Sequence, residues 1–149
     1  MTKLEVYLEL WDYLRTHGLR TIEVIEKANA WDYRINPNEY SVRETFRHAI
    51  QAIFEDAGNW FLKDPARFEP SNDPNADLHR ALDRMIGAIK DFSDEDLASD
   101  FTFPWGEKST VGGAIRQNLF HAVGHFSQLR NWAGVYRRSV SKDVEKSYL

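Results

Sequence analysis

The stretch NLFHAVGHFSQL, residues 118–129, combines the helical pattern that decides the fold with two histidines one turn apart. Each residue of an α-helix advances by about 100°, so His121 and His125 lie roughly 40° apart on one face. Phe126 and Leu129 belong to the apolar flank of the same helix. The stretch therefore predicts a core helix whose imidazoles point into or beside the protein interior.

Helical periodicity extends over most of the chain, at about residues 2–28, 41–62, 76–92 and 109–136. Ser41 and Glu44 form the pattern of a capping box at the start of the second stretch. Asp73 or Asn75 supplies the cap of the third. Between the last two lie a weak signal for a short helical turn, residues 94–97, and a brief strand signal, DFTF.

Four apolar helical stripes are most simply buried against one another, which predicts an all-α fold, a four-helix bundle with long connections between helices. The connections of about a dozen residues or more leave the helix topology open. A length of 149 residues predicts a single domain, residues 1–149.

Composition narrows the classes of function. The net charge of −4 argues against a nucleic-acid partner, because phosphate binding relies on clustered Lys and Arg. The chain has no cysteine, which excludes disulfides, thiolate ligands and a protein thiol nucleophile. Neither a signal peptide nor an apolar run of membrane-spanning length is recognisable, so we expect a cytoplasmic protein with no membrane partner.

A third histidine, His48, lies midway along the second predicted helix, one position off its apolar stripe. If the second and last helices face each other, His48, His121 and His125 meet, and three imidazoles with one open position are typical of catalytic zinc. The alternative is that the histidines are satisfied by the backbone or by neighbouring amides. His17 and His79 fit a metal site less well. The chain lacks the H-E-x-x-H of zinc proteases, since Ala122 occupies the Glu position.

The order of elements resembles the DinB-like (damage-inducible) family of metal-dependent helical bundles. The similarity covers most of the chain, through SVRETFRHAIQAIFEDAGNWFL and STVGGAIRQNLFHAVGHFSQLRNW. Members carry one histidine in the second helix and H-x3-H in the last, followed by a Gln-Leu pair; His48, His121, His125 and Gln128-Leu129 occupy these positions. The resemblance implies one divalent ion, commonly zinc or nickel, and a homodimer.

Imidazole ligands also suit cobalt and ferrous iron. The leading hypothesis for function is a thiol S-transferase, because some relatives use a low-molecular-weight thiol and a metal ion deprotonates thiols. The alternatives are metal-dependent hydrolysis, with Glu55 as the candidate proton-transfer group, and a non-catalytic bundle that binds an apolar ligand or a partner. Asn118 and Gln128 are candidates to orient an imidazole. The sequence singles out no catalytic residue.

Overall fold

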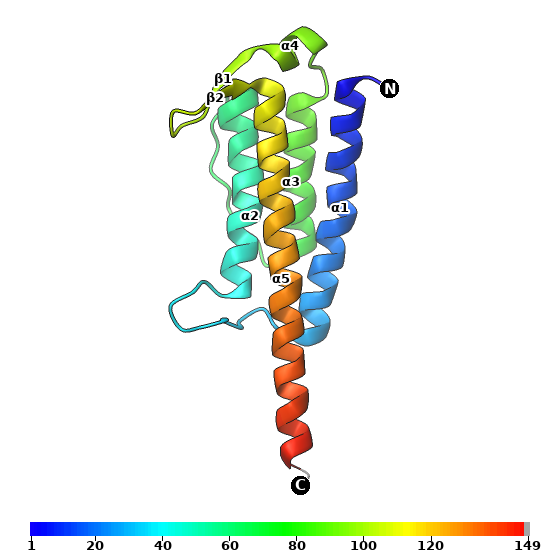
Figure 1. Ribbon diagram of the computed structural model, residues 1–149, viewed down its shortest axis with the longest axis vertical. Helices are drawn as coiled ribbons and strands as arrows, with labels where there is room; N and C mark the ends of the chain where they lie inside the picture. Colours follow the sequence, from blue (N-terminus) through cyan, green and yellow to red (C-terminus); the bar gives the residue numbers. More distant parts are fainter. Residues whose placement is uncertain (148–149) are drawn as a thin grey trace.

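The computed structural model describes residues 1–147, with side chains described to residue 141, and is mostly helical (Figure 1). Its elements, in chain order, are α1 (Lys3–Ala28), α2 (Val42–Asp56), the π-helical η1 (Ala57–Leu62), α3 (Pro74–Ile89), α4 (Asp94–Ala98), β1 (Asp100–Thr102), β2 (Lys108–Thr110) and α5 (Val111–Ser147). The helical content agrees with the predicted all-α class.

The four long helices α1, α2, α3 and α5 lie side by side (Figure 1). Helix α1 packs against α5 and α3, and α2 packs against the same two helices. The consecutive helices α1 and α2 therefore lie diagonally across the core from each other. The structure thus resolves the topology that the long connections left open.

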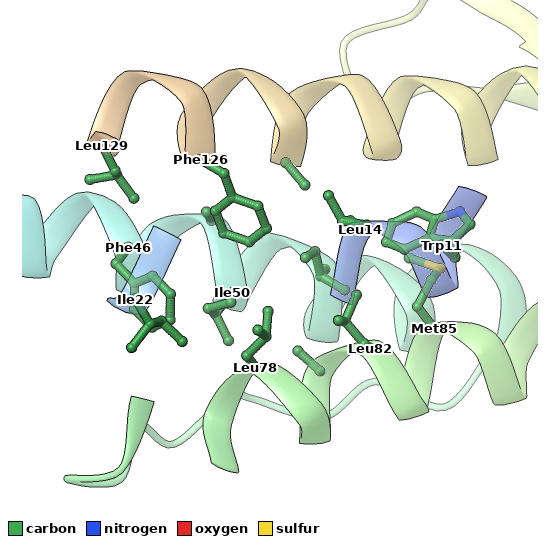
Figure 2. Packing of buried hydrophobic residues seen from close by; sticks show 14 of the residues in the cluster. Trp11, Leu14, Ile22, Phe46, Ile50, Leu78, Leu82, Met85, Phe126 and Leu129 are labelled. Carbon is green, nitrogen blue, oxygen red and sulfur yellow. The ribbon is translucent and has the colours of Figure 1, made fainter. Parts of the chain in front are cut away.

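The apolar stripes of the four helices meet in one core (Figure 2). Trp11 and Leu14 enter it from α1, Ile50 from α2, Leu82 from α3 and Phe126 from α5, each no more than 2% exposed. Burying a side chain of this size stabilises the fold by about 1.5–3 kcal/mol. The core therefore fixes the faces that the helices turn toward solvent and toward one another.

Helix ends follow local sequence signals where these are strong. The Ser41–Glu44 capping box is confirmed, with the Ser41 side chain accepting from the Glu44 backbone and Glu44 from Ser41. Asp73 caps α3, whose first residue is Pro74, so α3 begins and ends slightly earlier than predicted. The second predicted helix continues to Leu62, but its last six residues form the π-helical turn η1.

The segment before α5 differs most from the prediction. The DFTF strand signal corresponds to β1, which pairs antiparallel with a second strand, β2, that was not predicted. Gly106 adopts φ +96° in the connecting turn, a conformation that glycine tolerates best. Helix α5 extends to Ser147, well past the predicted end near Tyr136, and runs beyond the other helices (Figure 1). Within the described residues no helix is long and apolar enough to cross a membrane.

Gly18 lets α1 pack closely against α3 and α5. A Cβ there would lie 2.8 Å from Leu78 Cδ2 and 3.2 Å from Phe126 Cε2, both buried. We expect Gly18→Val to lower the free energy of unfolding by about 1–3 kcal/mol through overpacking, measured by urea denaturation. Gly87→Val is the matched control, because a Cβ on Gly87 meets nothing within 4 Å. Equal stability of the two variants would contradict this packing.

Candidate metal centre and adjoining cavity

Three histidines from two helices converge on one side of the structure. His48 lies in the middle of α2, and His121 and His125 lie one turn apart on α5. Helices α2 and α5 pack against each other and run in opposite directions (Figure 1). This packing brings together residues more than seventy positions apart in sequence, as the sequence analysis predicted.

The geometry of the three imidazoles suits a single ion. One ring nitrogen from each histidine lies within 4.8 Å of the other two. The Nε2 atoms of His121 and His125 are 3.1 Å apart. The centroid of the His48 ring lies 5.4 Å from the centroid of the His121 ring and 5.2 Å from that of the His125 ring. Nitrogens around a tetrahedral zinc at about 2.0–2.1 Å lie about 3.3 Å apart. The three side chains therefore fit one divalent ion after small ring movements.

The surroundings of the rings favour the neutral form that binds metals. Burial lowers the pKa of His48 and of His121, and the charge of His125 lowers both further. His125 Nδ1 lies 3.1 Å from Gln128 Oε1, so a proton on Nδ1 donates to the amide oxygen and leaves the Nε2 lone pair free. Gln128 thus lies where a side chain that orients a metal-bound imidazole is expected.

A cavity of about 250 Å³ opens beside the histidines. Its walls come from α2 and η1, from the β1–β2 turn and from α5. The lining residues are His48, Ala52, Asp56 and Trp60; Pro104 and Trp105; and Gln117, Asn118 and His121. The four lining residues from α2 and η1 are spaced four positions apart, from His48 to Trp60, which places one side chain per turn along the cavity.

The β1–β2 turn holds its aromatic residues at the cavity by packing. Phe103 is buried, and its ring stacks on that of Trp105 with centroids 4.5 Å apart. The Trp60 ring meets Phe103 edge to face at 5.6 Å. Phe103 therefore supports both tryptophans that line the cavity.

Asp56 is a feature that the sequence analysis did not identify. Its Oδ2 accepts a hydrogen bond of 2.7 Å from Asn118 Nδ2. Burial raises the pKa of Asp56 to about 6; the Asn118 hydrogen bond opposes this rise and the nearby Glu55 carboxylate adds to it. The spacing His48, Ala52, Asp56 on one helix was the available signal. It places Asp56, rather than Glu55, on the row that continues from His48.

The other candidates have defined positions. Glu55 Oε2 accepts from the backbone N–H of Phe68, and Glu55 is not among the described residues that line the cavity. Asn118 lines the cavity but donates to Asp56, so the proposed amide contact with an imidazole is made by Gln128. His17 and His79 lie outside the cluster, each within hydrogen-bonding distance of an arginine, Arg130 and Arg15 respectively.

Comparison with known proteins adds no relative. The chain matches no family model and no curated protein. The DinB-like assignment therefore stays a prediction based on the order of elements and the histidine spacing.

Ionised Asp56 should destabilise the fold above neutral pH. The pKa of Asp56 is about 6 in the folded chain, against about 3.9 in the unfolded chain, so folding favours the protonated carboxyl. The stability that this preference contributes is fully present below about pH 3.9 and is lost as the pH rises through about 6. We expect Asp56→Asn to gain about 1 kcal/mol over the wild type at about pH 8, allowing for partial solvent exposure, and little at about pH 4. Chemical denaturation at the two pH values tests this; a gain independent of pH would contradict it.

Proposed function

We propose that this chain is a metal-dependent enzyme built on a DinB-like four-helix bundle, and that it transfers a low-molecular-weight thiol to an electrophilic substrate. The observation that carries the proposal is the convergence of His48, His121 and His125 beside a cavity large enough for a small molecule. A histidine cluster at the edge of a cavity leaves a coordination position for a ligand, whereas a structural site is closed by protein.

Each part of the site has a role in this proposal. The three histidines would hold one zinc or nickel ion, and Gln128 keeps the His125 ring in the required tautomer. When bound, the ion lowers the pKa of a coordinating thiol and so supplies a nucleophile near neutral pH. Trp60 and Trp105 give the cavity an apolar wall for the electrophile. The thiol must come from a cosubstrate, because the chain has no cysteine.

Hydrolysis is the second candidate, and the position of Asp56 favours it. Metal-dependent hydrolysis needs a group that exchanges a proton near neutral pH, and the pKa of Asp56 of about 6 meets that requirement. Asp56 also lines the same cavity as His48 and His121. It replaces Glu55 as the candidate for this role.

Metal content tests the site itself. We expect protein purified without a polyhistidine tag to contain close to one divalent ion per chain by elemental analysis. His48→Ala should lose most of this ion, because two imidazoles from a single helix remain. His79→Ala is the matched control, since His79 lies against Arg15 outside the cluster, and should retain the metal. Equal metal content in the two variants would contradict the tri-histidine site.

Turnover separates the two reactions. Metal-loaded wild-type protein should conjugate a small thiol to a model electrophile such as 1-chloro-2,4-dinitrobenzene, and His121→Ala should reduce the rate by roughly a hundredfold or more as the site is lost. Formation of the thioether is followed by absorbance, and hydrolysis of a nitrophenyl ester is measured in parallel. Ester hydrolysis without conjugation would favour the hydrolase. Rates equal to those of His121→Ala in both assays would rule out both reactions for these substrates.

A further inference from the structure

The cavity has a second polar region, formed by Asp56 and Asn118, apart from the three imidazoles. Asn118 lies one helical turn before His121 on α5, and Asp56 lies two turns after His48 on α2. Trp60 lies one turn beyond Asp56 and lines the same space. A ligand in the cavity therefore meets the histidines at one end and the Asp56–Asn118 pair at the other.

This second region has more free hydrogen-bond acceptors than free donors. Asn118 is 2% exposed, and its Nδ2 group is already directed at Asp56 Oδ2. Asn118 Oδ1 is buried with no hydrogen-bond partner. Among the described side chains, Asn118 is the one donor to the Asp56 carboxylate, and it reaches only Oδ2. Apart from the second N–H of Asn118, the unused hydrogen-bonding capacity of the pair consists of oxygen lone pairs on Asp56 and Asn118. Oxygen lone pairs are satisfied by a ligand rich in N–H or O–H donors.

Charge narrows the class of donor. No lysine or arginine is among the described residues that line the cavity. Among the described residues, the other titratable groups that line the cavity are His48 and His121, and Glu55 lies beside Asp56 on α2. A half-buried carboxylate without a cationic partner is stabilised by a ligand that brings one. The Trp60 and Trp105 walls also favour a cation carried on an alkyl chain.

We propose that the Asp56–Asn118 end of the cavity binds a protonated primary amine, so that the natural ligand carries an amino group at one end and the group that reaches the histidines at the other. If the protein is the proposed thiol transferase, its thiol cosubstrate is an aminothiol; this step rests on the proposed function. The amine site itself depends only on Asp56, Asn118 and the aromatic walls.

Proton linkage gives this site a pH signature. Burial raises the pKa of Asp56 to about 6, whereas an alkylamine stays protonated to about pH 10. The ammonium ion needs the carboxylate, so its affinity should fall by up to about tenfold per unit as pH drops below 6. Burial lowers the pKa of His48 and His121, and their protonated forms would also repel the ammonium. The residual pH dependence in Asp56→Asn measures that contribution separately.

Calorimetric titration with matched probes tests the proposal. Butylamine and 1-butanol are titrated into metal-free protein, and 3-aminopropanethiol and 3-mercaptopropanol into zinc-loaded protein, at about pH 7.5. We expect each amine to bind about tenfold or more tightly than its alcohol, as a hydrogen bond between charged groups provides. Asp56→Asn should abolish this preference, and Asn118→Ala should weaken it. Glu55→Gln is the matched control, because its side chain is directed to Phe68, and should keep the preference.

The outcomes distinguish the amine site from the proposed reaction. A wild-type protein that binds amine no better than alcohol, including one that binds neither, overturns the amine site whatever the zinc result. A preference that persists in Asp56→Asn also overturns it. An intact preference for butylamine without any thiol conjugation leaves the amine site established and overturns the thiol transferase. The comparison of amine with alcohol in the wild type needs no variant to fold.

Discussion

The packing of α2 against α5 is the contact on which the candidate site depends. The Phe46 and Phe126 rings stack in the core with centroids 6.4 Å apart, and each lies within two residues of a histidine of the cluster. Because a helix turns by about 100° per residue, a shift of one residue at this contact would point His48 away from His121 and His125. The close-packed interior permits few such shifts, so the core holds the three rings together although no hydrogen bond between described residues joins the two helices at that point.

Burial is the main cause of the shifted pKa values of the acid and the bases around the cavity. Burial raises the pKa of Asp56 and lowers the pKa of His48 and His121, so in each case the uncharged form gains. Opposite shifts of an acid and of bases are the signature of poor hydration rather than of a single neighbouring charge. Charges interact strongly where water is scarce. This suits both proposals, an ion at the three histidines and a protonated amine at Asp56 and Asn118.

Sequence patterns predicted what depends on local periodicity and could not predict what depends on contacts between elements. The helix starts followed from capping residues such as Ser41 and Asp73, and the histidine cluster from two spacings and a family resemblance. The polar extension of α5 past Tyr136 has no apolar stripe to reveal it. Strand β2 was missed because its three residues are defined by pairing with β1. The sequence analysis named Glu55 and not Asp56 as the proton-transfer candidate. The two carboxylates are adjacent on α2, and only the hydrogen bond from Asn118 on α5 shows which of them faces the cavity.

The histidines and the β1–β2 turn both border the cavity, but they are held by different kinds of support. The histidines lie on long helices that the core holds rigidly, which is what metal geometry demands. Pro104 and Trp105 lie on a short turn, anchored by buried Phe103 and made possible by Gly106. A turn tolerates substitution and insertion far better than a packed helix does. Changes in this turn would therefore alter the wall of the cavity while leaving the histidine cluster unchanged. Under the proposed function, the helices would supply the metal site and the turn would contribute to ligand specificity.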